Sequence, residues 1–173
     1  MSNRYSLLPR DSNQALGIGQ YAIDFLSGAG EPEPAVLAKP EQFHLDSVAC
    51  GYAALGISAN APTILREEAL DYSLEASDAL GACCFGATQP VRAEKAILAN
   101  CSAVRELDAN GTNFGYNPAT GDCRGEFGHN DFYPVCIAAA QQQRDDDPQT
   151  LLALACLDDI RRPLAEVLAL KDH

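Results

Sequence analysis

Tryptophan is absent from the 173-residue chain, and methionine occurs once. Alanine and leucine dominate the 47% of residues that are hydrophobic, which suits packed helices better than a β-sandwich. All uncharged apolar runs are far shorter than the about 18 residues that a membrane-spanning helix requires. The N-terminal residues also lack the apolar core and small-residue cleavage site of a signal peptide. We therefore expect an all-α, cytoplasmic protein with no membrane contact.

Positive charge is also scarce in this sequence. Lysine and arginine total 12, against 24 aspartate and glutamate residues, which gives a formal net charge of −12. Binding to a nucleic-acid backbone depends on Lys and Arg side chains that neutralise phosphates. Attraction to an anionic membrane surface depends on the same side chains. The charge therefore argues against nucleic acids and membranes as partners.

The cysteines do not have the spacing of a metal site. There are seven of them, and neither a Cys-x-x-Cys pair nor a zinc-type histidine spacing occurs. Cys83 and Cys84 form the only close pair, and adjacent cysteines do not easily bind one metal. Buried free thiols in a reducing compartment are the simplest interpretation. We predict no structural metal.

Length and periodicity predict one helical domain over residues 13–173, preceded by an arm at residues 1–12. Pro40 should stop a short helical turn, and Pro163 should kink or split the last helix, whose apolar face Asp158 and Arg162 interrupt. Residues 80–86 are short and apolar, so we expect at most one strand pair there. The expected helices cover residues 13–26, 35–39, 41–57, 62–74, 92–107, 132–143 and 148–170.

The stretch 92–131 is the most informative part of the sequence. Its first half has apolar residues at steps of three and four, and the helix should end near residues 108–111, where Asn and Gly tolerate a left-handed backbone. A polar segment then runs to the next helix. It is either a solvated connection or a loop that carries binding and catalytic groups. His44, on the expected helix 41–57, is by contrast typical of a structural histidine.

Several motifs carry a family resemblance. The run Ala99-Asn-Cys-Ser-Ala-Val-Arg-Glu-Leu-Asp-Ala-Asn-Gly-Thr112 is followed by Gly125-Glu-Phe-Gly-His-Asn-Asp131, and Phe43-His-Leu-Asp-Ser-Val-Ala-Cys-Gly51 precedes both. In this order they resemble the 2-methylcitrate dehydratase (MmgE/PrpD) family, which has a helix ending in Leu-Asp-x-(Asp/Asn)-Asp-Thr and then a Gly-His-Pro segment. The likeness covers most of residues 13–170.

The resemblance implies site residues one position at a time. Asp108, Thr112 and His129 match catalytic positions of the family motifs, and Asn110 matches an Asp/Asn position. Arg124 is the candidate for binding a substrate carboxylate. Gly111 stands where the family has its second aspartate, and Asn130 stands where a proline follows the histidine.

The resemblance also implies a function. The family consists of cofactor-independent lyases and related enzymes that act on small tricarboxylates, including the dehydratase of propionate catabolism, and its members are usually dimers. Dehydration next to a carboxylate needs a base and an acid, roles that a histidine can fill. The family architecture continues into an α/β lid domain and further cationic residues that this sequence does not contain.

We therefore expect a truncated MmgE/PrpD-type helical domain that is inactive alone. It would form a homo-oligomer or join a complementary chain carrying the rest of the fold. The alternative is a non-catalytic helical module that assembles with a partner chain.

Overall fold

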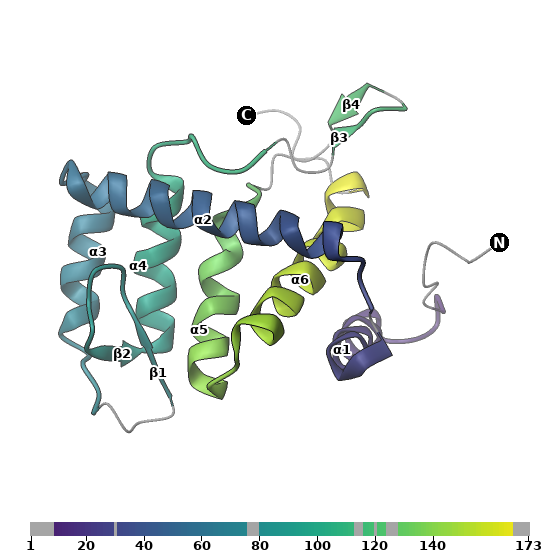
Figure 1. Cartoon of the computed structure of the whole chain (residues 1–173), viewed down its shortest axis with the longest axis horizontal. Helices are drawn as coiled ribbons and strands as arrows, with labels where there is room; N and C mark the ends of the chain where they lie inside the picture. Colours follow the sequence, from purple (N-terminus) through teal and green to yellow (C-terminus); the bar gives the residue numbers. More distant parts are fainter. Residues whose placement is uncertain are drawn as a thin grey trace.

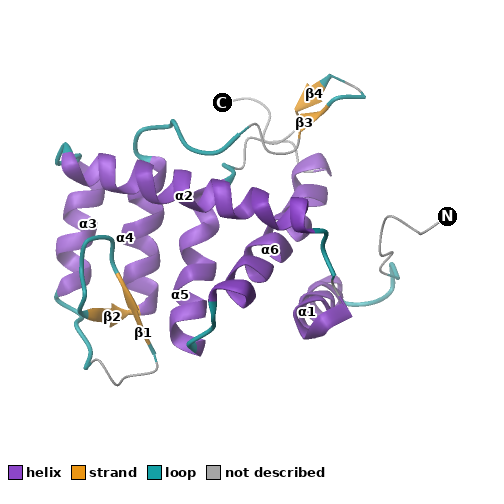
Figure 2. Ribbon diagram, in the orientation of Figure 1, coloured by secondary structure: helices purple, strands orange, loops and turns teal. Residues whose placement is uncertain are grey.

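A computed structural model of the chain describes residues 9–29, 31–75, 80–112, 116–119, 121–123 and 128–167. The described residues are mostly helical, as predicted (Figures 1 and 2). Six α-helices occur in these ranges: α1 Gln14–Asp24, α2 Pro34–Gly56, α3 Asn60–Leu70, α4 Ala93–Arg105, α5 Tyr133–Gln143 and α6 Asp147–Val167. A π-helical segment, Phe25–Ala29, follows α1, and a 3-10 turn, Asn130–Phe132, precedes α5. None of the described helices alone has both the length and the apolar character needed to cross a bilayer.

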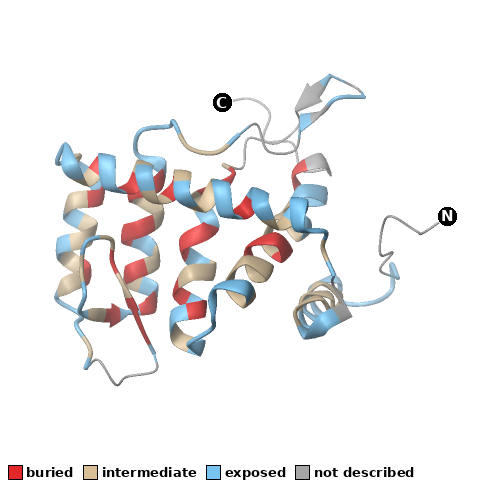
Figure 3. Ribbon diagram, viewed as in Figure 1, coloured by how far each residue is buried: buried red, intermediate tan, exposed pale blue. Residues whose placement is uncertain are grey.

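α4 is the central helix of the fold. It lies between α3 and α5, and α2 runs across the ends of all three (Figure 1). Its buried side chains are mostly small, which lets the neighbouring helices approach closely: Ala93, Ala96, Ala99, Asn100, Ala103 and Val104. Figure 3 shows this buried material on α4 and on the faces of α5 and α6, whereas α1 contributes no buried residue.

Two short strand pairs are present in the described ranges, one more than predicted. β1 Gly81–Cys83 pairs antiparallel with β2 Pro90–Arg92, where the apolar segment suggested an extended structure. β3 Tyr116–Asn117 pairs with β4 Asp122–Cys123 within the polar segment, where we expected no strand. Strands of two residues are too short to show an alternating pattern, but Gly121, with a φ of +66°, is a turn signal between them.

The prediction that Pro40 separates two helices is wrong, because α2 is continuous from Pro34 to Gly56. A proline removes one helical N–H, which here leaves the carbonyl of Val36 without its usual donor. Val36 is half exposed, so water can bond that carbonyl, while the Pro40 ring is buried. Pro163 likewise does not split α6. It deprives the carbonyl of Asp159, another exposed residue, of its helical donor.

α2 is also less buried than its apolar composition suggests. Only Pro40, Ser47, Gly51 and Ala54 are buried in it, and Leu45 and Tyr52 are more than half exposed. α3 ends at Leu70, earlier than the predicted residue 74, because the chain turns at residues 71–72 to reach β1. The buried residues of α2 face α4 and α6, and its exposed residues form a second face towards solvent.

Candidate functional site

The candidate site lies where the C-terminal end of α4 meets the N-terminal end of α5. α4 ends at Arg105, and the chain then passes through left-handed backbone at Asp108 (φ +48°) and Gly111 (φ +73°). The 3-10 turn Asn130–Phe132 packs against α4 at the same place. The two segments that the sequence analysis singled out, around residues 110 and 129, are therefore neighbours.

Asn110 and Gly111 make this contact directly. The Asn110 amide donates to Oδ1 of Asn130 at 2.6 Å and also to the carboxylate of Asp131. A Cβ placed on Gly111 would lie 2.8 Å from the Cβ of His129 and 2.9 Å from Oδ1 of Asn130. Contacts shorter than 3.0 Å require a shift of the neighbours. Packing therefore demands glycine at the position where the resembled family has an aspartate.

Asp46 on α2 joins both segments from the side. Its Oδ2 accepts the backbone N–H of Gly111 at 2.7 Å and the Nδ2 of Asn130 at 2.9 Å. The fully buried Asn130 also donates to the carbonyl of Phe43 at 2.7 Å, and its own carbonyl accepts from the Ser47 hydroxyl at 3.3 Å. A buried amide with this many partners fixes the relative positions of α2, α4 and α5.

His129 is enclosed by aromatic rings and a carboxylate. Its side chain is 4% exposed. The Phe43 ring meets it edge-on with ring centres 4.2 Å apart, and the Tyr133 ring centre lies 5.8 Å away. Its Nε2 is 3.4 Å from Oδ2 of Asp158 on α6. A carboxylate next to an imidazole orients the ring, which is the arrangement of many proton-transferring histidines.

Asp158 also accepts a hydrogen bond from Tyr133. The phenol donates to the same Oδ2 at 2.6 Å. Burial raises the pKa of Tyr133 above its ordinary value, and the hydrogen bond to Asp158 raises it further. The phenol consequently stays protonated at any physiological pH and acts as a fixed donor.

Arg161, one turn further along α6, holds the backbone at His129. Its guanidinium donates to the carbonyls of Gly128 at 2.5 Å and of His129 at 2.6 Å, and it lies 4.1 Å above the centre of the Phe132 ring. Burial lowers the pKa of Arg161, and the neighbouring carboxylate of Asp158 opposes that shift. An arginine so engaged is a positioning group, since its donors already serve the main chain.

The five predicted site residues are only partly brought together. Asn110 contacts the segment that carries His129, through Asn130 and Asp131. Asp108 is 77% exposed at its side chain and is paired with Arg105 at 2.6 Å, with the guanidinium of Arg105 also 3.9 Å from Asp131. Thr112 is exposed at the end of a described range, and Arg124 lies outside the described residues.

The arrangement can orient a proton carrier. Within the described ranges no group of three or more His, Cys, Asp or Glu side chains lies close enough to hold a metal ion.

Comparison with protein-family models, with curated proteins and with solved structures finds no match to this chain.

Asp46, which stands in the Phe43–Gly51 run, and Arg161 were given no role from the sequence, and Asp158 was noted only as an interruption of an apolar face. These residues lie on α2 and α6, far along the chain from the motif that they support. A charged residue on the apolar face of a helix was the available signal, because buried charges need partners. This signal correctly marks Asp158, which pairs with His129. It does not hold for Arg162, the other charged residue on that face, because Arg162 is exposed and pairs with Asp159.

Proposed function

We propose that this chain contributes the acid–base half of a lyase site of the 2-methylcitrate dehydratase (MmgE/PrpD) type, acting on a small tricarboxylate. The supporting observation is the meeting of the two motif segments, Asn110–Gly111 against residues 128–131, around one oriented histidine. The Asn110 hydrogen bonds and the close packing of Gly111 against His129 tie these segments together, and a merely solvated connection does not need such contacts.

His129 would carry the proton in this reaction. Elimination beside a carboxylate requires a base that removes a carbon-bound proton and an acid that protonates the departing hydroxyl. Asp158 orients the imidazole through Nε2, and Arg161 fixes the backbone beneath it. Asp108 and Thr112, at the solvent side of the same turn, would meet the substrate from outside.

The cationic half of the site would come from other polypeptide. A tricarboxylate needs several charge-assisted contacts. Among the described residues, Arg105 contacts this turn through Asp108 and Asp131, and Arg161 contacts it by donating to two backbone carbonyls. Lys95, on the same helix as Arg105, is bonded to Glu68. We infer that a second copy or a complementary chain supplies the missing cations, so the isolated chain does not turn over substrate.

A second candidate is a non-catalytic helical module that assembles with a partner chain. The observation that favours it is the 4% exposure of His129, with Phe43 and Tyr133 against the ring. In this interpretation the polar network serves to lock α2, α4, α5 and α6 together.

A citrate titration followed by amide NMR separates the two candidates. The lyase proposal expects weak citrate binding with localised shifts of Gly111, His129 and Asp131. Arg105→Ala should weaken this binding by up to about fivefold, since an exposed ion pair contributes up to about 1 kcal/mol. Lys39→Ala removes another exposed cation, on α2, and should leave those shifts unchanged. Shifts spread over the surface, or no shifts, would favour the module. Turnover of citrate, 2-methylcitrate or cis-aconitate by the purified chain would refute the dependence on other polypeptide.

A further inference from the structure

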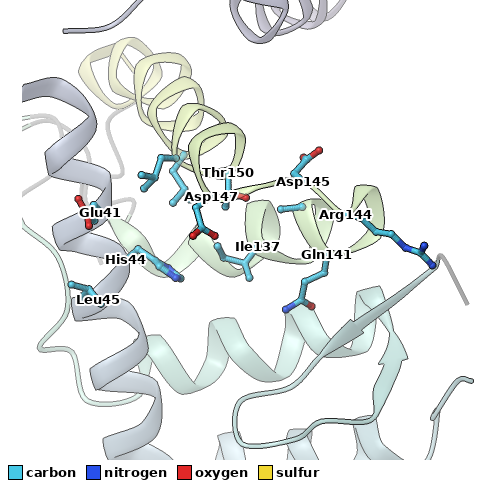
Figure 4. A pocket seen from close by; sticks show the side chains of 12 residues that line it. Glu41, His44, Leu45, Ile137, Gln141, Arg144, Asp145, Asp147 and Thr150 are labelled. Atoms are coloured by element: carbon cyan, nitrogen blue, oxygen red, sulfur yellow. The ribbon is translucent and has the colours of Figure 1, made fainter. Parts of the chain in front are cut away.

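A hollow of about 440 Å³ lies between α2, α5 and α6, apart from the residues that surround His129. Figure 4 shows it from close by, with side chains from all three helices around it. Its volume falls within the range of about 300–1,000 Å³ that is usual for small-molecule sites. None of its lining residues belongs to the proposed lyase site.

One side of the hollow is apolar. Ile137 of α5 and Leu151 and Leu154 of α6 line it, and Leu154 is fully buried. Leu45 of α2 lies at the margin and is 64% exposed. These aliphatic side chains could cover a short hydrocarbon chain, which would stabilise a bound ligand by removing apolar surface from water.

The charged groups of the hollow are mainly acidic. Glu41, Asp145 and Asp147 line it, against one guanidinium, that of Arg144. Figure 4 shows the Asp147 carboxylate on the side of the hollow that faces His44, while Arg144 extends away. In the part of the chain that the structure describes, neither Glu41 nor Asp147 has an ion-pair partner.

His44 adds a polar group that the fold leaves unsatisfied. Its Nδ1 is buried, and within the described ranges it has no hydrogen-bond partner. Buried polar atoms in proteins nearly always have one, so such an atom beside a hollow points to a missing partner. Burial lowers the pKa of His44, so the ring is neutral near pH 7 and can accept a hydrogen bond through one nitrogen.

We propose that this hollow binds a small organic cation, a primary ammonium group on a short alkyl chain. The ammonium would donate to Asp147, Glu41 and the imidazole of His44, and the alkyl chain would lie on Ile137 and Leu151. A metal ion fits less well, because no three His, Cys, Asp or Glu side chains among the described residues are placed to bind one together. An anion would meet more carboxylates than cations here.

Matched probes test the charge requirement directly. Pentylammonium, 1-pentanol and pentanoate share one alkyl chain and differ in charge, and each is titrated into the ¹⁵N-labelled chain at pH 7.5 and low salt. We expect pentylammonium to shift the amide signals of His44, Ile137 and Leu151, with pentanol binding at least about fivefold more weakly and pentanoate not at all. Equal binding of all three probes, or shifts scattered over the acidic surface, would overturn the proposal.

Matched variants test the location. Asp147→Asn and Glu41→Gln should each weaken pentylammonium binding about threefold to fivefold, as expected for the loss of one exposed charge contact. Both positions are exposed, so the fold should survive. Asp11→Asn makes the same change of net charge at an exposed site before α1 and should leave binding unchanged. An equal effect of Asp11→Asn would show that only the overall charge attracts the amine. The amine probes do not test citrate binding, so this site and the lyase site can fail separately.

Discussion

Replacing Gly111 by alanine is the sharpest test of the contact between the two motif segments. The residue has a φ of +73°, a conformation that costs a residue with a Cβ about 1–2 kcal/mol. The new methyl group would also lie 2.8 Å from the Cβ of His129 and 2.9 Å from Oδ1 of Asn130. Both neighbours are held, Asn130 by its hydrogen bonds and His129 by the surrounding rings. Overpacking of this kind costs about 1–3 kcal/mol, so the free energy of unfolding should fall by about 2–5 kcal/mol in total.

Gly121→Ala is the matched control for that substitution. Its φ is +66°, but a Cβ there would meet nothing within 4 Å. It should therefore cost only the backbone part, about 1–2 kcal/mol or less. Urea unfolding followed by circular dichroism measures both variants, and the midpoint should shift at an unchanged slope. Equal losses for Gly111→Ala and Gly121→Ala would refute the close approach of Gly111 to the segment that carries His129.

Three further outcomes follow from the structure. Arg161→Ala should lower the free energy of unfolding by about 2–4 kcal/mol, because two carbonyls lose a charged donor, whereas the exposed Arg162→Ala should change it by at most about 1 kcal/mol in the same urea assay. Burial raises the pKa values of Cys101 and Cys136 to about 11, so at pH 8 both thiols should react about 100-fold more slowly in the native chain than in urea, as mass spectrometry of alkylated peptides would show. The raised pKa of Tyr133 means that above pH 10 the unfolded chain loses a proton that the folded chain keeps. The free energy of unfolding should therefore fall with pH there, and Tyr133→Phe should remove up to about 1.4 kcal/mol per pH unit of that fall. Equal stability losses for Arg161→Ala and Arg162→Ala would contradict the first prediction, and equal alkylation rates in the native chain and in urea would contradict the second. The third would be wrong if Tyr133→Phe left the pH dependence of the unfolding free energy unchanged.

The helices were predictable because their signals are local. Asn13 caps α1 by accepting the N–H of Ala15, and Pro134 sits in the first turn of α5, where its missing N–H is tolerated. The errors came from residues whose effect depends on burial and solvent. Pro40 was expected to break a helix, and its effect is small because the affected carbonyl belongs to the exposed Val36. Sequence alone does not indicate which orphan carbonyl can reach water.

The site was predictable only along the motif itself. Asn110 and His129 were candidates from the sequence, and the structure places their segments in contact. Asp46 and Asp158 come from helices separated from that motif by dozens of residues, so no spacing pattern could assign them as partners. The mutual geometry of α2 and α6 decides their roles, and that geometry depends on packing that no local signal encodes.

Asp46 explains how the two motif segments can stay together across the long stretch that separates them. Its single carboxylate bonds the main chain of Gly111 and the side chain of Asn130, so the register between the segments is set from α2. Two consecutive residues of α2 contact the two proposed sites. Phe43 packs against the ring of His129, and His44 lines the hollow between α2, α5 and α6. A small rotation of α2 about its axis would therefore alter the enclosure of His129 and the shape of the hollow together. If both sites bind as proposed, each ligand should change the apparent affinity for the other by the same factor, because such coupling is reciprocal.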